Sequence, residues 1–135
     1  MTDKILLTGI SGWIAKHTAI ELLNAGYEVL GTVRNNTLIE QTKETISQHA
    51  SIDKLSFVKL DLLKDDGWNE AAYGCKYIMH LASPFPFKVS NNRNSLLAPA
   101  VDGTLRVLNA GLNADVEQFI VTSSIAAMFR KPNRS

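Results

Sequence analysis

The sequence predicts an α/β fold, a doubly wound parallel sheet of about five strands with helices on both faces. Short apolar runs alternate with longer stretches of helical periodicity along the 135 residues. The apolar runs are continuous, as in parallel strands buried on both faces, rather than alternating with polar residues. Since crossovers between parallel strands are right-handed, we expect helices on both sides of one sheet, within a single domain over residues 1–135.

The first half of the chain opens with an apolar run, a glycine-bearing turn and a helix. One face of that helix carries Ala15, Ala19, Leu22 and Leu23, and Gly26 stands where a left-handed C-cap belongs. The elements expected here are a strand over 4–8, a helix over 13–25, a strand over 28–34, an exposed helix over 37–49 and a strand over 54–59.

The second half continues the same alternation. Its expected elements are a short helix over 65–72, a strand over 76–80, a proline-bearing loop over 83–89, a long helix over 92–113 and a strand over 117–122. Pro99 is expected to kink the long helix or to mark its first turn. One face of this helix is expected to carry Leu97, Val101, Thr104, Leu108 and Leu112.

Composition excludes several classes of protein. Fourteen Lys and Arg against thirteen Asp and Glu give no basic surface for nucleic acid or for a membrane. The single cysteine, Cys75, cannot form an internal disulfide and is expected to be inert. No apolar run approaches the roughly 20 residues of a membrane-spanning helix, and the N-terminus lacks a signal-peptide core. These features favour a cytoplasmic protein; no metal site is predicted.

The turn after the first strand has the spacing of a phosphate-binding turn. Gly9, Gly12 and Ala15 stand three residues apart, between a predicted strand and a predicted helix. Gly9 allows a tight turn, and the missing side chain at Gly12 lets backbone N–H groups at the helix start approach a pyrophosphate. A small residue at Ala15 allows the helix to pack closely on the strand. The alternative is a tight turn that binds nothing.

The end of the second predicted strand bears on which dinucleotide would bind. A site for NAD usually has a carboxylate about 20 residues beyond the glycines, on the ribose 2′-hydroxyl. No Asp or Glu occurs between Glu28 and Glu40, and Arg34 stands at the expected place. Because the planar guanidinium suits a phosphate dianion, the sequence favours NADP. The alternative is a solvated surface arginine.

Several short motifs together resemble the extended short-chain dehydrogenase/reductases, in particular the branch of dihydroflavonol 4-reductases and cinnamoyl-CoA reductases. In chain order, the motifs are Thr8-Gly9-x-x-Gly12-x-x-Ala15, Thr32-Val33-Arg34, Asp61-Leu62, His80-x-Ala82-Ser83-Pro84, Val101-x-Gly103-Thr104 and Thr122-Ser123-Ser124. Ala15 replaces a glycine found in most members. The resemblance implies a Rossmann fold and covers about residues 4–129.

The resemblance also implies which residues hold NADP. The pyrophosphate would lie on Gly9, Ser11, Gly12, Trp13 and Ile14. Asp61 and Leu62 would hold the adenine, with a helix or turn cap as the alternative role for Asp61. The ribose on the nicotinamide side would be lined by Leu81, Ala82 and Ser83.

Ser124 matches the catalytic serine of the family and would hydrogen-bond a substrate carbonyl. Strand alternation is expected to turn Ser123 to the opposite face. His80 is expected to be a packed histidine at a strand end. The family also needs a Tyr with a Lys four residues later, yet the residues four positions after Tyr27, Tyr73 and Tyr77 are Gly31, Tyr77 and Leu81.

The sequence therefore predicts the NADP-binding part of a reductase that transfers hydride from NADPH to a small ketone or aldehyde. The catalytic Tyr-x-x-x-Lys, a sixth strand and the substrate lobe would follow beyond Ser135, so this chain alone is expected to bind the dinucleotide without reducing a substrate. Two alternatives stay open, an NADP-sensing regulator without catalysis and an NAD-linked nucleotide-sugar epimerase or dehydratase. The sequence does not predict an oligomeric state.

Overall fold

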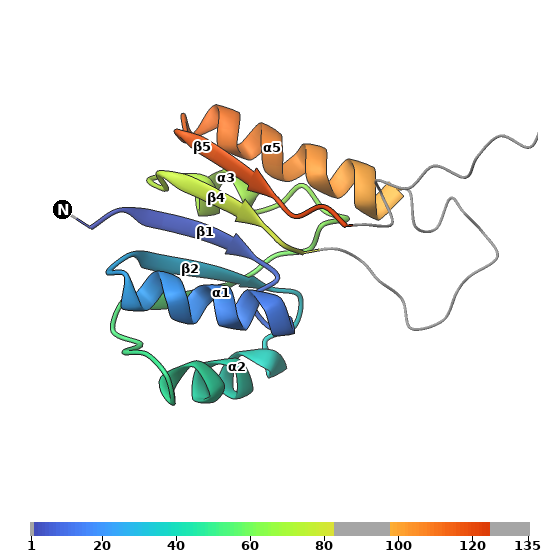
Figure 1. The fold of residues 1–135 in the computed structure, drawn as a ribbon. Helices are drawn as coiled ribbons and strands as arrows, with labels where there is room; N and C mark the ends of the chain where they lie inside the picture. Colours follow the sequence, from blue (N-terminus) through green and yellow to red (C-terminus); the bar gives the residue numbers. More distant parts are fainter. Residues whose placement is uncertain (1, 83–97, 125–135) are drawn as a thin grey trace, which may run out of the picture.

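The computed structural model describes residues 2–82 and 98–124, which form one five-stranded, all-parallel sheet. The strand order is β3-β2-β1-β4-β5, and the carboxyl ends of all strands lie at the same edge (Figure 1). The strands are β1 (Lys4–Thr8), β2 (Glu28–Val33), β3 (Leu55–Lys59), β4 (Tyr77–His80) and β5 (Gln118–Val121). All five stand within one or two residues of the predicted limits, so the predicted fold class is confirmed.

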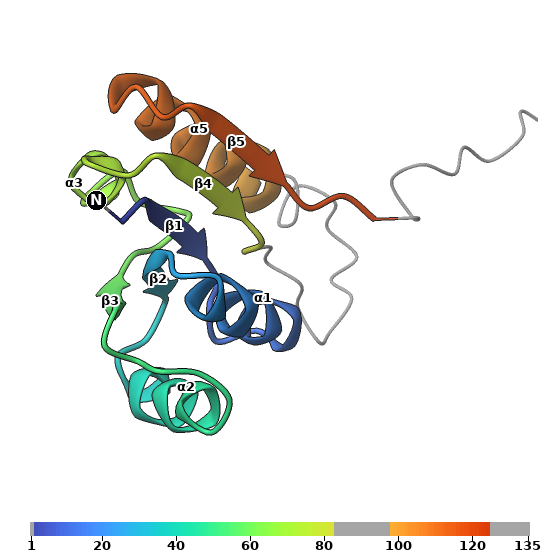
Figure 2. The ribbon, with the colours of Figure 1, turned by 60° about the vertical axis from the view of Figure 1, so that its left-hand side comes forward.

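Helices cover both faces of this sheet, as right-handed crossovers require (Figure 2). The helical elements are α1 (Trp13–Asn24), α2 (Thr37–Ser47), α3 (Trp68–Ala72), the π-helical segment η1 (Ala98–Asp102) and α5 (Gly103–Asn113). Helices α1 and α2 lie on one face, and α3 and α5 lie on the other (Figure 1). None of the helices within 2–82 and 98–124 is both long enough and apolar enough to cross a lipid bilayer.

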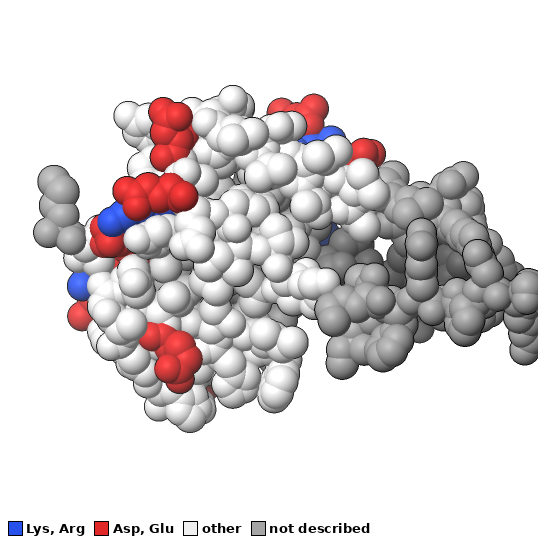
Figure 3. Space-filling view, turned by 45° about the horizontal axis from the view of Figure 1, so that its top comes forward, with Lys and Arg blue, Asp and Glu red and all other residues white. Residues whose placement is uncertain are grey.

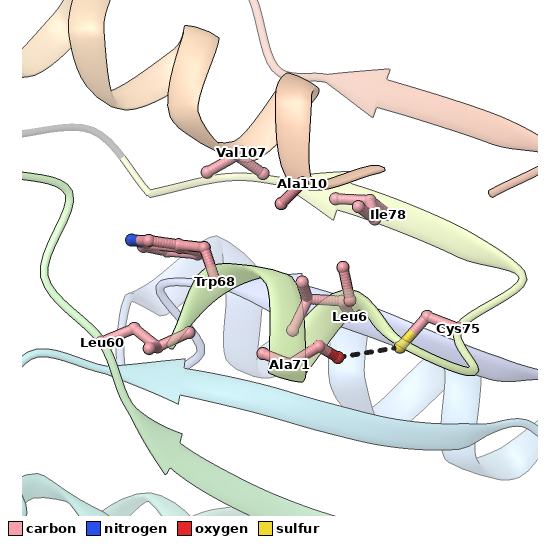
Figure 4. Close-up of a cluster of buried hydrophobic side chains, with 9 residues drawn as sticks. Leu6, Leu60, Trp68, Ala71, Cys75, Ile78, Val107 and Ala110 are labelled. Carbon is pink, nitrogen blue, oxygen red and sulfur yellow. Dashed lines mark hydrogen bonds between the residues drawn. The ribbon is translucent and has the colours of Figure 1, made fainter. Parts of the chain in front are cut away.

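Each face of the sheet has its own apolar core, and the two cores meet at β1. Leu6 points into the cluster under α3 and α5, while the adjacent Leu7 points into the cluster under α1 and α2. Figure 4 shows the first cluster, in which Trp68, Ile78 and Val107 are fully or almost fully buried. The turn over residues 9–12, the glycine turn, therefore begins at the end of a strand that is packed on both faces.

Cys75 belongs to the first cluster and is buried, as an unreactive thiol would be. Its thiol donates a hydrogen bond to the Ala71 carbonyl oxygen at 3.3 Å (Figure 4). Burial raises the pKa of the thiol, with small opposing effects of Lys4 and Glu28. A raised pKa disfavours the reactive thiolate.

The long predicted helix differs from its prediction in two respects. It is divided into η1, which contains Pro99, and α5; residues 92–97 and the predicted loop over 83–89 lie outside the described part of the chain. The predicted face is also wrong, because Val101 and Leu112 are 51% and 67% exposed. The buried face of α5 instead carries Gly103, Val107, Ala110 and Gly111.

The small residues explain this difference. A Cβ atom added at Gly111 would stand 3.0 Å from Cδ1 of Ile78, so the helix lies too close to the sheet for a larger side chain. Helix α5 therefore approaches the sheet mainly through glycine and alanine, with Val107, and leaves Leu105 and Leu112 on the outer face. A pattern based on large apolar residues cannot identify such a face.

Charged side chains on the face shown in Figure 3 form small groups on a largely uncharged surface. Lys76 forms one group of charges, 3.3 Å from Asp3 and 3.8 Å from Glu117. The hydrogen bond and the charge of Asp3, with the charge of Glu117, raise the pKa of the half-buried Lys76 ammonium.

Candidate functional site

The predicted cofactor residues lie where the strand order reverses. From β1, the chain first builds outward through β2 and β3 and then returns to place β4 and β5 on the other side of β1. Ligands of open parallel sheets bind outside the carboxyl ends of the strands at such a point. The loop after β1 contains Gly9 and the loop after β4 contains Ala82. These loops touch, since a Cβ added at Gly9 would stand 2.9 Å from the Ala82 Cα.

The conformation of Gly9 requires glycine. Its φ of +70° is in the left-handed region, where side chains are disfavoured, and Ala82 leaves no room for a Cβ. Two hydrogen bonds to Thr32 in β2 hold this turn: the Gly9 N–H donates to Oγ1 at 3.0 Å, and the Ile10 N–H donates to the carbonyl oxygen at 3.1 Å. The turn is thus fixed between β2 and the loop after β4.

The start of α1 is open to an anionic ligand. Gly12 is the N-cap residue, and no side chain there caps the helix. A Cβ added at Gly12 would meet only the Gly9 carbonyl oxygen, at 3.3 Å, and would otherwise enter open space. Uncapped N–H groups at a helix start attract anions, so this geometry fits a pyrophosphate. Ser11 is half-buried beside the turn.

Ala15, Trp13 and Ile14 complete the first turn of α1. Ala15 is only 3% exposed, as expected for the small residue that packs the helix on the sheet. Trp13 and Ile14 point outward, 74% and 59% exposed, and line a groove of about 540 Å³ with Leu22 and Met79 among its other walls. The sequence analysis assigned no role to this groove. A second groove of about 380 Å³, between α3 and α5, contains no predicted cofactor residue.

Arg34 directly follows β2, at the same edge of the sheet as the glycine turn. Its side chain is exposed, and in the described part of the chain no carboxylate lies within 4.0 Å of it. The next residue, Asn35, turns the chain into α2 by accepting the Thr37 N–H at 3.1 Å. The guanidinium is therefore available to an external anion.

Asp61 and Leu62 lie in the loop after β3 and are half-buried. The Asp61 Oδ1 atom accepts the Leu63 N–H at 2.9 Å, which is the turn cap considered as its alternative role. The second carboxylate oxygen has no such partner in the described region, so the cap and an adenine contact are compatible. Arg106 donates to the Leu62 carbonyl oxygen and holds this loop on α5.

The side chain of Trp68 also holds the loop after β3 in place. Its indole N–H lies 3.1 Å from the Asp61 carbonyl oxygen and 3.0 Å from that of Lys64. The sequence did not predict Trp68 and Arg106 as supports of the proposed adenine residues. The available signal was weak, since a buried tryptophan needs a partner for its N–H but the sequence does not indicate which one.

The loop after β4 is tied to the end of β1. The N–H groups of Leu81 and Ala82 both donate to Thr8 Oγ1 at 3.0 Å. His80 is the last residue of β4 and is 4% exposed, which confirms it as a packed histidine. Burial lowers the pKa of its imidazole below 6.5. Ser83, predicted to lie on the ribose, is outside the described residues.

Ser124 lies at the same edge of the sheet, beyond the end of β5. The strand ends at Val121, and Ser123 and Ser124 are both exposed in the segment after it. The expected strand alternation between these two serines is therefore wrong, because neither residue is in the strand. The Thr122 N–H still donates to the His80 carbonyl oxygen at 3.2 Å. Within 2–82 and 98–124, no hydrogen bond joins Ser124 to the predicted cofactor residues.

Comparison with known proteins identifies the family. Dihydroflavonol 4-reductase of Hordeum vulgare is 34% identical over 92% of this chain and 35% of its own length. Cinnamoyl-CoA reductase 1 of Petunia hybrida is 36% identical over 96% of this chain and 38% of its own length. The chain therefore spans little more than a third of these relatives.

A solved structure and a family profile agree with these relatives. The structure of yeast methylglyoxal/isovaleraldehyde reductase complexed with NADPH superimposes with a TM-score of 0.81, at 30% identity over 93% of this chain and 38% of that one. The profile of the NAD dependent epimerase/dehydratase family matches residues 5–135. With almost the whole sequence matched, this chain belongs to the NAD dependent epimerase/dehydratase family.

Proposed function

We propose that this chain is the NADP(H)-binding part of a reductase acting on a small ketone or aldehyde. The observation that carries the proposal is the shared position of Gly9, Gly12 and Arg34 at one edge of the sheet. An open helix start and an exposed guanidinium there suit the pyrophosphate and the 2′-phosphate of one dinucleotide. The relatives named above are oxidoreductases, and the yeast structure contains NADPH, which supports the same reading.

Each predicted residue has a stated role in this proposal. Backbone N–H groups over residues 11–14 would bind the pyrophosphate, while Gly9 keeps the turn tight. Arg34 would bind the 2′-phosphate with its planar fork. The free carboxylate oxygen of Asp61 would accept the adenine amino group, and the Leu62 N–H would meet a ring nitrogen. The loop of Leu81, Ala82 and Ser83 would lie along the second ribose.

The chemical step is proposed for a longer form of the protein. NADPH supplies the hydride, and Ser124 would orient the substrate carbonyl and stabilise the charge that develops on its oxygen. None of the three tyrosines in the 135 residues is followed four positions later by lysine. A proton donor of the type that the family uses is thus missing, and we expect binding without reduction by the chain alone.

Arg34→Ala tests the cofactor assignment. Loss of a charge-assisted contact should weaken NADPH binding by about 1.5–3 kcal/mol, or about 10- to 100-fold, and should leave NADH binding almost unchanged. Lys54→Ala is the matched control, because Lys54 is also exposed and precedes β3 at the opposite edge of the sheet. Calorimetric titration gives both affinities. Equal affinities of the unmodified chain for NADPH and NADH would refute the preference for NADP.

Gly12→Val tests the phosphate turn. The backbone at Gly12 has φ −70° and ψ 156°, which valine adopts readily, so the unfolding midpoint in urea should change little. The side chain would fill the space of the pyrophosphate, and dinucleotide binding should be lost. Normal binding by Gly12→Val would mean that the phosphate site lies elsewhere.

Two alternative functions are distinguished by different observations. The family description favours an NAD-linked epimerase or dehydratase, whereas the exposed Arg34 and the missing carboxylate between Glu28 and Glu40 favour NADP. A sensor that binds NADP without catalysis has no use for the carbonyl-orienting Ser124. Assay of a longer form containing Tyr-x-x-x-Lys against a panel of aldehydes separates the reductase from both alternatives, because only the reductase consumes NADPH.

A further inference from the structure

A buried hydrogen-bond chain connects the end of β1 to the end of β4. Thr8 Oγ1 lies 2.8 Å from His80 Nδ1 and also receives the N–H groups of Leu81 and Ala82. A hydroxyl has two acceptor lone pairs and one hydrogen. Because the two backbone N–H groups occupy the lone pairs, the Thr8 hydrogen must point to His80 Nδ1, which therefore carries no proton.

The other ring nitrogen, Nε2, extends this hydrogen-bond chain toward α5, and each group donates to the next. His80 Nε2 faces Thr104 Oγ1 at 3.4 Å, and the Thr104 hydroxyl donates to the Ala100 carbonyl oxygen at 2.7 Å. Thr104 thus gives its hydrogen to Ala100 and accepts from Nε2. The geometry assigns His80 as the neutral tautomer with its proton on Nε2, bridging β1 and the junction of η1 with α5.

The surroundings of the ring favour this neutral form. Thr8 of β1 is fully buried, Phe119 of β5 has its ring centroid 6.4 Å from the imidazole, and Thr104 faces it from α5. None of these three side chains carries a charge. Burial lowers the pKa of His80, and a buried imidazolium without a carboxylate partner is disfavoured.

Protonation of Nδ1 would disturb the loop after β4. An Nδ1–H would need an acceptor, but both lone pairs of Thr8 are occupied by the Leu81 and Ala82 N–H groups. Either the imidazolium stays unpaired or one of these backbone groups loses its partner. Ala82 packs so closely against Gly9 that a Cβ added at Gly9 would not fit. A shift of the loop after β4 would therefore also displace the glycine turn.

We propose that neutral His80 is a positioning residue for the dinucleotide site, acting through the Thr8 hydroxyl on Leu81 and Ala82, and that its protonation weakens dinucleotide binding. This inference rests on the proposed function. It adds a pH-sensitive element to the cofactor half of the site, in a side chain that is not expected to touch the cofactor.

The test is the pH dependence of dinucleotide affinity of the whole chain between about pH 5 and pH 8. NADH is titrated as well as NADPH, because the 2′-phosphate of NADPH itself gains a proton near pH 6. Affinity for both should fall on acidification, by at most about tenfold per pH unit for one proton.

Two substitutions separate positioning from packing. In His80→Asn the Oδ1 atom can accept the Thr8 hydrogen near the place of Nδ1 but cannot titrate, so the affinity for NADH should stay near its neutral value across the pH range. In His80→Gln the polar atoms lie near the place of Nε2, so affinity should be reduced at every pH. Equal behaviour of the two variants would overturn the proposal, as would parallel pH profiles of His80→Asn and the unmodified chain.

The tautomer can be tested without a substitution or a cofactor. In the unmodified chain at neutral pH, nitrogen NMR of the histidine rings should find His80 protonated on Nε2 and unprotonated on Nδ1. The opposite tautomer overturns the proposal. Failure to bind either dinucleotide at pH 8 would overturn the proposed function, whereas binding without any dependence on His80 would overturn this inference alone.

Discussion

Gly9→Ala is expected to destabilise the protein and to weaken dinucleotide binding. The added Cβ would stand 2.9 Å from the Ala82 Cα and 3.1 Å from the Ala82 N, at a φ of +70°. A non-glycine residue in the left-handed region costs about 1–2 kcal/mol. Displacing a packed backbone adds about 1–3 kcal/mol, so we expect a loss of about 2–5 kcal/mol in the free energy of unfolding.

Gly74→Ala is the matched control, because Gly74 has φ +78° but nothing lies within 4 Å of an added Cβ. It should lose only the conformational term, about 1–2 kcal/mol. Urea denaturation of both variants gives the difference, which measures the contact between the glycine turn and the loop after β4. Equal losses in the two variants would refute the argument that this contact holds the turn. Titration with NADPH should find weaker binding in Gly9→Ala alone.

Three further predictions concern other parts of the structure. Gly31→Ala should destabilise the protein by about 1–3 kcal/mol in urea denaturation, because its Cβ would collide with the side chain of Ile10. The free energy of unfolding should fall on acidification below about pH 6.5, by at most about 1.4 kcal/mol per pH unit. The reason is that burial lowers the pKa of His80, so the unfolded chain binds a proton there at a higher pH than the folded chain does. His80→Asn should remove this pH dependence. In an active longer form, Ser124→Ala should lower kcat about 100-fold without changing the affinity for NADPH.

Each of these has a result that contradicts it. Unchanged stability of Gly31→Ala would mean that Ile10 repacks freely. A pH slope that persists in His80→Asn would assign the proton to another group. Normal turnover by Ser124→Ala would leave Ser124 without a catalytic role, and the adjacent Ser123, equally exposed after β5, would be the next residue to substitute.

The strands and the position of the glycine turn could be predicted because they depend on local chemistry. A continuous apolar run such as residues 5–7 is buried on both faces wherever it lies in a parallel sheet. The left-handed backbone at Gly9 requires glycine, and the sequence shows that glycine directly. The parallel arrangement then brings the end of β2, with Arg34, to the same edge as the glycine turn. The rule for crossover handedness predicted helices on both faces, but it does not fix the strand order β3-β2-β1-β4-β5, which only the structure shows.

The features that could not be predicted depend on contacts between distant segments. The face of α5 is set by small residues, and the pattern of large residues points away from it. The hydrogen bond between Thr8 and His80 joins residues 72 positions apart. The supports of the Asp61 loop come from Trp68 and Arg106, whose types alone indicate no partner.

Thr8 and Thr32, at the ends of β1 and β2, explain how the glycine turn keeps one geometry. Beyond the ends of the strands, the backbone N–H groups of the following loops have no hydrogen-bond partner in the sheet and would be left unpaired. The Thr32 hydroxyl accepts the N–H of Gly9, and the Thr8 hydroxyl accepts those of Leu81 and Ala82. Each orphaned group would cost about 1–3 kcal/mol. Valine at either position would keep the strand and the glycine spacing, yet it would leave these groups unpaired. The glycines therefore make the tight turn possible, and the buried hydroxyls hold it in place.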